Sequence, residues 1–208
     1  MLSALEAEDA AQMALEAAFV EDVVALAVDR DAVLSGQTGD AGIDAEDEET
    51  RVKALAQRPS YRVVYSERYS GKDADARAAQ VAIYRYDTQQ AIFAKVDLES
   101  GDVEPLALPD GAAVPLVPEE IREAAVVALA DPAVRDRLAA DGIDPDQAQA
   151  NGLLTTTDDG TSPCATSRCI RLFFGTLERP VPDFTVVVDL VALDVVEMAD
   201  MPGRSLNP

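Results

Sequence analysis

The sequence predicts an α+β fold of two tandem modules, each with a helix packed on an antiparallel sheet of about four strands. A fifteen-residue stretch occurs twice, as IFAKVDLESGDVEPL at 92–106 and FTVVVDLVALDVVEM at 184–198. Both copies alternate apolar residues before a short turn, which is typical of a strand that enters a hairpin. In each half, helical patterns precede the strands. A repeated unit of this kind indicates a duplicated module.

The first module is predicted to cover residues 1–112 and to begin with a long helix. Ser3 and Glu6 have the spacing of a capping box, and apolar residues after them form a loose helical stripe. A helix is therefore expected over residues 3–34. Residues 35–49 are rich in glycine and aspartate, so they are expected to form a solvated, acidic linker.

The strands of the first module follow a short helix. That helix is expected over residues 48–57, because the residue before Pro59 is biased away from helical dihedrals. Alternating residues then predict a strand over 61–69 and another over 79–86, which leads into the first hairpin. In the strand 61–69, one predicted face carries Tyr61, Val63 and Tyr65, and the other carries Arg62, Val64 and Ser66.

The second module is predicted to cover residues 113–208. The segment 108–118 contains three prolines and one glycine and marks the boundary between the modules. Pro118 is expected to begin a helix, because proline suits the first helical turn. Glu119 and Glu120 would then lie at the positive end of the helix dipole, where acidic side chains are stabilising.

The rest of the second module repeats the plan of the first. A second helix is expected over 132–140, stopped at Gly142. A loop rich in Thr, Asp and Gly leads to a strand over 169–174, and a turn over 178–183 leads to the second hairpin, 184–198. A helix laid across a curled antiparallel sheet in each half is a cystatin-like arrangement.

Smaller features extend the repeat and also limit it. The turn of the first hairpin contains Gly101, which takes positive φ at little cost, whereas the second turn, 191–194, has no glycine. The helical patterns share an alanine-rich motif, with Ala10, Ala11, Ala14 and Leu15 recurring as Ala124, Ala125, Ala128 and Leu129.

The charge of the chain is its most unusual bulk property. It has 39 acidic and 17 basic residues, a net charge of −22. Such a molecule repels itself at low ionic strength, and salt screens that repulsion. The acid excess, the scarcity of lysine and the abundance of small apolar residues favour a halophilic, salt-accumulating cytoplasm, and the alternative is an ordinary acidic protein. Nucleic acid and anionic membranes are excluded as expected partners, because both require a basic surface.

The sequence favours a cytoplasmic protein. Its first residues are acidic where a signal peptide is basic, and no apolar run reaches the length of a membrane span. Two cysteines, Cys164 and Cys169, are too few for a secreted disulfide framework.

Several motifs resemble the small N-terminal α+β domains of copper amine oxidases. The second half is similar to the third of these domains through Asp131–Ile143, Arg179-Pro180-Val181, Val188-Asp189-Leu190 and Asp194-Val195-Val196. The first half resembles the preceding domain through Ala82-Ile83-Tyr84, Val96-Asp97-Leu98, Gly101 and Val103. The resemblance covers roughly residues 48–198. It implies two small domains that, in that family, flank the substrate channel and help to shape the dimer.

The chain departs from that family in its chemistry. It has no histidine for a three-histidine copper site, and neither Asn151 nor Asn207 begins the Asn-Tyr motif that provides the quinone cofactor. We expect the catalytic β-sandwich to be absent as well. No catalytic, cofactor-binding or metal-binding residue is therefore transferred, and no cofactor is expected.

Asp97 and Asp189 occupy equivalent positions in the two hairpins, which raises the question of a catalytic carboxylate pair. Aspartate near the end of a strand commonly accepts hydrogen bonds from turn amides. Nothing else in the sequence completes a catalytic constellation around them, so a structural role is favoured.

Cys164 and Cys169 allow several interpretations. They are compatible with free thiols, a disulfide that closes a small loop, or a redox pair in which Arg168 lowers a thiolate pKa. Two thiols without histidine make a poor metal site. In a reducing cytosol two free thiols are favoured, and the disulfide is the next alternative.

The remaining candidates are weaker. The acidic run 44–49 lacks the spacing of a calcium loop, so a solvated linker is favoured. Residues 155–160 are expected to form a turn-rich loop. Nucleophilic catalysis requires a base beside the nucleophile, and no motif supplies one.

These observations predict a non-catalytic structural or interaction protein that pairs with itself or with a larger polypeptide. The alternative is an accessory subunit of an amine oxidase whose catalytic domain is a separate chain. A third interpretation, a ligand-binding or peptidase-inhibiting cystatin-like module, is weakened because the chain lacks the Gln-Xaa-Val-Xaa-Gly motif of cystatin inhibitors.

Overall fold

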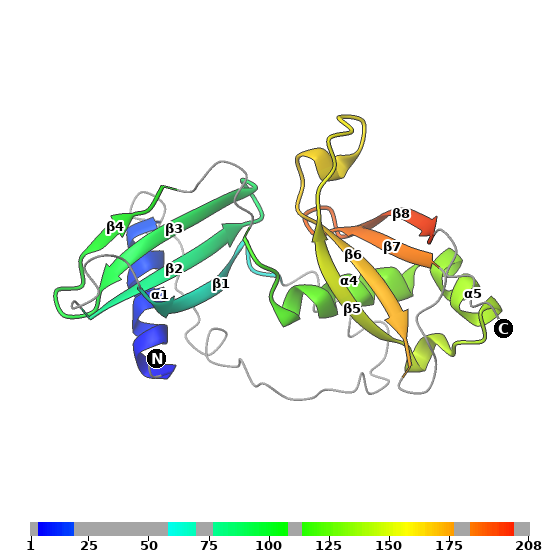
Figure 1. Cartoon of the computed structure of the whole chain (residues 1–208), viewed down its shortest axis with the longest axis horizontal. Helices are drawn as coiled ribbons and strands as arrows, with labels where there is room; N and C mark the ends of the chain where they lie inside the picture. The colour runs from blue at the N-terminus through cyan, green and yellow to red at the C-terminus, as the bar shows by residue number, and fades with distance from the viewer. Residues whose placement is uncertain (1–3, 19–57, 70–76, 108–113, 177–183, 202–208) are drawn as a thin grey trace. The chain divides into compact units, whose positions relative to one another are not determined.

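The computed structural model describes residues 4–18, 58–69, 77–107, 114–176 and 184–201. The expected linker, the short helix over 48–57 and the second half of the long N-terminal helix lie outside these residues. The described residues form an α+β protein with three α-helices and two four-stranded antiparallel sheets (Figure 1). None of those helices has the length and apolar character needed to cross a membrane.

The chain divides into two compact units, which are described separately. Among the described residues, the first unit contains 4–18, 60–69, 77–107 and 114–115, and the second contains 58–59, 116–176 and 184–201. Arg58 is thus grouped with the second unit, although it precedes the strands of the first. Its guanidinium lies 3.1 Å from a carboxylate oxygen of Glu123 and donates to the carbonyl of Leu190.

The first unit packs one helix on a sheet with strand order β1-β2-β3-β4. Its elements are α1 (Ala4–Ala18), β1 (Tyr61–Arg68), β2 (Ala78–Arg85), β3 (Gln90–Asp97) and β4 (Val103–Pro105). In Figure 1 the blue helix α1 lies across one face of this sheet. The alanine motif of the helix provides the contact, because small side chains allow a close approach. The buried core consists of Ala10, Ala11, Ala14, Ala79, Val81, Ile83, Ala94 and Val96.

The faces predicted for β1 are correct only at its start. Val63 pairs with Ile83, but the next paired residue on β1 is Tyr65, opposite Ala82, so Val64 forms a β-bulge. The bulge moves Tyr65 to the face away from α1, and Ser66 to the helix side, where its hydroxyl donates to the carbonyl of Ala7 (3.1 Å). Because a bulge adds one residue to one strand, every later side chain changes face.

The second unit packs two helices with a sheet of order β5-β6-β7-β8. The helices are α4 (Pro118–Ala130) and α5 (Pro132–Ala140), with short 3-10 turns η2 (Pro145–Gln147) and η3 (Pro163–Ala165). The strands are β5 (Gln149–Thr155), β6 (Cys169–Gly175), β7 (Phe184–Asp189) and β8 (Asp194–Asp200). The core joins α4 and α5 to the inner face of the sheet, through residues that include Ala124, Ala128, Leu138, Ile170, Leu172, Phe174, Phe184, Val186 and Val188.

Acidic residues at the starts of the two helices of this unit make capping hydrogen bonds. The Glu120 carboxylate accepts from the amide of Val117 (3.1 Å), and Asp131 accepts from the amide of Ala133 (2.7 Å) at the start of α5. Gly142 has φ of 74° and follows the end of α5, where a glycine is expected because left-handed backbone suits it. Both predicted helices are confirmed.

The sequence analysis missed one strand. β5 lies in a region predicted to be loop, and it pairs with β6 from Gln149 opposite Gly175 to Thr155 opposite Cys169. The inner face of β5 leaves no room for a side chain at Gly152, because a Cβ atom there would lie 2.4 Å from the side chain of Ile170. The loop that does follow, between β5 and β6, extends away from the sheet at the top of the second unit in Figure 1.

Candidate functional site

The first hairpin turns around Asp97. Its Oδ1 accepts hydrogen bonds from the amides of Glu99 (2.8 Å) and Ser100 (3.0 Å), while its carbonyl accepts from the amide of Gly101 (2.9 Å). The hydrogen bonds from the amides of Ser100 and Glu99 stabilise the charged carboxylate and hold the pKa of Asp97 below its ordinary value.

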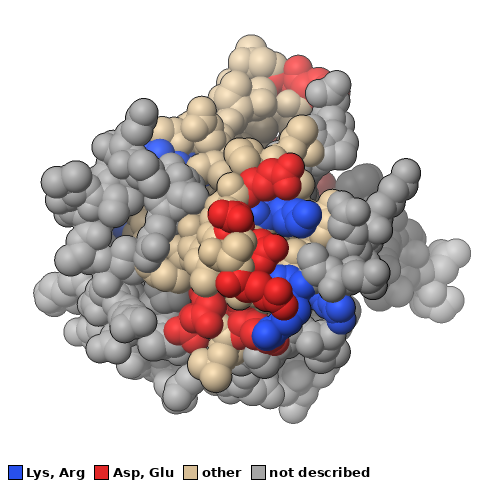
Figure 2. Space-filling view, turned by 90° about the vertical axis from the view of Figure 1, so that its left-hand side faces the viewer, with Lys and Arg blue, Asp and Glu red and all other residues tan. Residues whose placement is uncertain are grey.

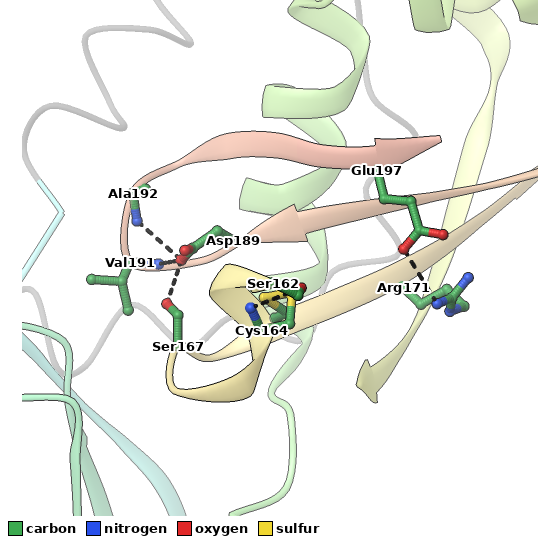
Figure 3. Close-up of a disulfide and its surroundings, with 9 residues drawn as sticks. Ser162, Cys164, Ser167, Arg171, Asp189, Val191, Ala192 and Glu197 are labelled. Carbon is green, nitrogen blue, oxygen red and sulfur yellow. Dashed lines mark hydrogen bonds and ion pairs between the residues drawn. A yellow bond between two sulfur atoms is a disulfide. The ribbon is translucent and has the colours of Figure 1, made fainter. Parts of the chain in front are cut away.

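The second hairpin turns around Asp189 with the same hydrogen bonds. Its Oδ1 accepts from the amides of Val191 (2.7 Å) and Ala192 (3.1 Å), and its carbonyl accepts from the amide of Leu193 (2.9 Å). Asp189 is 6% exposed, and its carboxylate gains a further donor, the Ser167 hydroxyl at 2.6 Å. Figure 3 shows these donors converging on one carboxylate oxygen. Asp189 is therefore the more enclosed of the two turn aspartates.

The two turns also share their unusual backbone. Gly101 has φ of 78°, and Leu193, at the corresponding position of the second copy, has φ of 56°. Left-handed backbone costs an L-residue roughly 1–2 kcal/mol. The second hairpin therefore has the same turn as the first, although a leucine occupies the position of the glycine.

These hydrogen bonds give each turn aspartate a structural task within its own unit. Each carboxylate binds the amides of the turn that follows it, as expected for aspartate at the end of a strand. The Ser167 hydroxyl donates to the same oxygen of Asp189 as the turn amides, so it belongs to the hydrogen bonds that hold this turn. The geometry matches the structural role that the sequence analysis favoured.

An ion pair links the helix to the sheet in each unit, and the two pairs correspond. In the first unit Arg77, just before β2, pairs with Glu6 of α1. In the second, Arg168, just before β6, binds Glu120 of α4 through Nε to Oε1 (2.7 Å) and Nη2 to Oε2 (2.9 Å). In both units the carbonyl of this arginine also accepts a hydrogen bond from the residue that follows the turn aspartate. The amide of Leu98 donates to Arg77, and the amide of Leu190 donates to Arg168 (2.8 Å each).

The two ion pairs differ in their exposure. The side chains of Arg77 and Glu6 are 60% and 30% exposed, whereas those of Arg168 and Glu120 are 4% and 0% exposed. A buried ion pair contributes little net stability, yet removing one partner leaves an uncompensated buried charge. Arg168 is thus a structural residue. The sequence analysis considered Arg168 only as a neighbour of the cysteines, and what Arg168 shares with Arg77 is its position directly before a strand.

Cys164 and Cys169 form a disulfide, with Cα atoms 5.5 Å apart. The sequence analysis favoured free thiols, and that prediction is wrong because η3 and the start of β6 bring the two residues together. The bridge is buried on the outer face of the sheet against Val187 and Val196. Ser162 caps η3 by accepting from the amide of Cys164 (3.3 Å), as Figure 3 shows. Arg168 binds Glu120 here, so the proposed redox role for it is not supported.

The other candidates show no assembled site. The acidic run 44–49 lies outside the described residues, and Thr155 ends β5 instead of beginning a loop. In that loop Asp159 accepts from both the amide and the hydroxyl of Thr161 (2.9 and 2.7 Å), and the hydroxyl contact is the main cause of its lowered pKa. Across the described residues, no group of three or more acidic, cysteine or histidine side chains is placed to hold a metal ion.

Charged side chains on the surface lie close to one another. Figure 2 shows acidic and basic groups interspersed on one face of the molecule. Ion pairs among the described residues join Arg85 with Asp87 (2.7 Å) in the first unit, and Arg122 with Glu119 (2.7 Å) and Arg135 with Asp146 (2.9 Å) in the second. Exposed pairs of this kind contribute at most about 1 kcal/mol each.

Comparisons with known proteins assign no family to the chain. No family model matches it, and no curated protein matches its sequence. Among solved structures, it is similar to a copper-containing benzylamine oxidase from Hansenula polymorpha, at 18% identity and a TM-score of 0.45. That match covers 62% of this chain and 21% of the oxidase, so the matched part spans about a fifth of that protein. A likeness at this level identifies no relationship.

Proposed function

We propose that the chain is a non-catalytic structural or interaction protein built from two duplicated, cystatin-like modules. On the sequence motifs described above, it resembles the accessory N-terminal domains of copper amine oxidases. It works through its surfaces, in association with a second copy or a larger polypeptide. No copper or quinone chemistry is assigned to these residues.

The proposal rests on the hydrogen bonds and ion pairs that the recurring polar side chains make within each unit. The turn aspartate, the arginine before the second strand of each hairpin pair and the helix glutamate recur in both units, and each is occupied by a structural bond. A catalytic group must instead present a proton, a charge or a lone pair to a substrate. Polar groups that recur in both units and are bonded within each unit support the proposal that the protein works through its surfaces.

Amine turnover provides the first test. The purified chain, incubated with Cu²⁺ and a panel of primary amines in molar KCl, is expected to release no hydrogen peroxide above the protein-free blank. A complete amine oxidase assayed in the same buffer is the positive control. Reproducible turnover that copurifies with the chain contradicts the proposal.

Capture from the native source, at the salt concentration of that source, provides the second test. The proposal expects recovery of a second copy or of one stoichiometric protein partner. Recovery of a histidine-rich chain with an Asn-Tyr motif would favour the alternative, an accessory subunit of an amine oxidase. A strictly monomeric chain without any partner would count against both.

A further inference from the structure

The bridge between Cys164 and Cys169 closes a short loop, residues 164–169, here called the disulfide loop. Its two ends belong to different elements, because Cys164 lies in η3 and Cys169 begins β6. Between them, Ser167 and Arg168 bond to other elements of the second unit. Figure 3 shows Ser167 on this loop, beside the bridge. The disulfide loop therefore connects the bridge to contacts elsewhere in the unit.

The disulfide loop holds the turn of the β7–β8 hairpin by two hydrogen bonds. The Ser167 hydroxyl donates to Asp189 (2.6 Å), whose carboxylate also accepts the amides of that turn. The carbonyl of Arg168 accepts from the amide of Leu190 (2.8 Å). Because both bonds reach adjacent residues of the hairpin, a change in the conformation of the loop acts directly on the turn.

The disulfide loop also holds the start of α4. The Arg168 guanidinium binds Glu120 at 2.7 and 2.9 Å, and the same carboxylate caps the helix by accepting from the amide of Val117 (3.1 Å). Both side chains of this ion pair are buried. Burial of an ion pair costs desolvation, which is offset only while the geometry of the pair is maintained. A loop closed by a disulfide maintains it, because the loop is already rigid in the bound conformation.

The first unit contains the same ion pair without a bridge. Its pair joins Arg77 and Glu6, and both cysteines of the chain lie in the second unit. The side chains of the first pair are in contact with solvent, whereas those of the second are enclosed. The pair beside the bridge is thus the enclosed one, as expected if the bridge keeps it in place.

We propose that the bridge between Cys164 and Cys169 is a redox-sensitive latch. While it is closed, the disulfide loop holds the start of α4 and the turn of the β7–β8 hairpin together, and reduction releases both. A dithiol reductant supplies the two electrons that break the S–S bond and is itself oxidised to a disulfide, and each cysteine sulfur gains one hydrogen. The cysteines are 5% and 0% exposed, so the latch responds to prolonged reducing conditions. The proposal goes beyond the proposed function and does not depend on it.

Hydrogen exchange of the full chain in 2 M KCl, before and after reduction by a dithiol, tests the release. Reduction is expected to speed exchange about tenfold or more at the amides of Leu190 and Val191, which bond to Arg168 and Asp189. The amides of Leu98 and Glu99 make the corresponding bonds in the first unit and are the matched control. Unchanged exchange at Leu190 and Val191, or an equal rise at Leu98 and Glu99, overturns the latch.

The effect of E120A separates a latch from a crosslink that only stabilises the unit as a whole. In the oxidised protein E120A is expected to raise the unfolding constant of the second unit about a hundredfold or more, because Arg168 stays buried without a partner. In the reduced protein Arg168 is released to solvent, and the same change is expected to raise that constant about fivefold or less. E6A in the first unit is the matched control and should have one effect in both states. Equal effects of E120A in both states overturn the latch.

The variant C164A/C169A provides the open state without any reductant. It is expected to fold, to match the reduced protein in exchange at Leu190 and to leave the first unit unchanged. A second unit that unfolds altogether, both in this variant and in the reduced protein, overturns the latch, because a latch releases a loop and leaves the sheet intact. Exchange at Leu190 that equals that of the oxidised protein overturns it as well.

Discussion

Single residues decide how closely the two hairpins resemble each other. The aspartates Asp97 and Asp189 were recognisable in the sequence because they recur at the same offset with the same neighbours. Leu193 was not, since leucine carries no signal for positive φ, and only the turn imposed by Asp189 requires it. The bulge at Val64 was also not predictable, because the strand pattern predicts side chains that alternate between the two faces and a bulge has no reliable signature in a single sequence.

Exchanging the turn residues gives a reciprocal stability test. Replacing Leu193 by glycine is expected to raise the free energy of unfolding of the second unit by about 0.5–1 kcal/mol, because glycine relieves the left-handed strain. Replacing Gly101 by leucine is expected to lower that of the first unit by about 1–2 kcal/mol for the opposite reason. Denaturant titration in 2 M KCl measures both changes, with L193A as the control that keeps a Cβ. Stabilisation by L193A equal to that by L193G would contradict this explanation.

The two ion pairs predict unequal responses to the same mutation. E120A is expected to destabilise the second unit by about 3–5 kcal/mol, because Arg168 would remain buried and uncompensated. E6A removes the exposed counterpart and is expected to cost about 1 kcal/mol or less. Thermal unfolding in molar salt compares them, and the double variant E120L/R168M is expected to recover much of the loss. Equal losses for E120A and E6A would disprove the effect of burial.

Acid is expected to weaken the turns. The pKa of Asp97 is lowered by its amide donors, that of Asp87 by Arg85, and that of Asp159 by Thr161. A carboxyl with a lower pKa in the folded state contributes stability above its ordinary value of 3.8, and this is lost as the pH falls through the folded-state pKa. Unfolding titrations from pH 6 to pH 2 measure the slope. It should become shallower in D97N, and an unchanged slope would show that this turn does not contribute.

For Tyr65 the stability contribution is lost as the pH rises, because its pKa in the folded state is raised. Burial is the main cause of that rise, and the hydrogen bond to Glu67 is the second. The pKa of Tyr65 is raised to about 12. The unfolded chain would ionise near pH 10 while the folded chain stays neutral, so the contribution of Tyr65 to stability is lost as the pH rises from about 10 to about 12.

At the scale of elements, sequence patterns recovered those with strong local signals. The helices α4 and α5 both begin with proline and have acidic or capping residues nearby, while α4 ends just before Pro132 and α5 just before Gly142, so both were predictable. β5 was missed because threonine, aspartate and glycine follow it directly, and Gly152 in its centre reads as a loop residue. The alternation of Ala150, Gly152 and Leu154 was present, but glycine contributes no apolar signal. The disulfide depended on geometry that the sequence does not contain.

A substitution at Gly152 tests whether β5 packs closely on the core because this residue has no side chain. G152A is expected to lower the free energy of unfolding of the second unit by about 1–3 kcal/mol, because the new methyl group overlaps buried Ile170 and approaches Ile121. G160A is the control, since a Cβ there meets no atom within 4 Å. Differential denaturation of the two variants measures the effect. A loss for G160A as large as that for G152A would contradict it.

For the whole molecule, charge and the disulfide point to different surroundings. A net charge of −22 favours a salt-rich solution, the environment predicted from composition. A disulfide is unusual in a reducing cytosol and usual in an oxidising compartment. The cytoplasmic location therefore stays a prediction, and the redox state of the protein isolated from its source bears on it directly.

Reduction tests both the bridge and its contribution. The native protein is expected to gain the mass of two hydrogens on reduction. Opening so short a loop is expected to lower the stability of the second unit by about 2 kcal/mol, because loop-closure entropy is regained by the unfolded chain. Mass spectrometry and denaturation before and after reduction measure these changes. A protein already carrying two thiols when alkylated in the cell extract would contradict the bridge.

The corresponding glutamate–arginine pairs make this chain its own reference for electrostatics. One pair lies in contact with solvent and the other is enclosed, while the helix, the strand and the turn around each are alike. Double-mutant cycles in both units, followed across a range of KCl concentrations, would measure the coupling energy of each ion pair. They would separate the effect of screening by salt from the effect of burial in a low dielectric. The comparison would be made within a single polypeptide, in one solution and at one temperature.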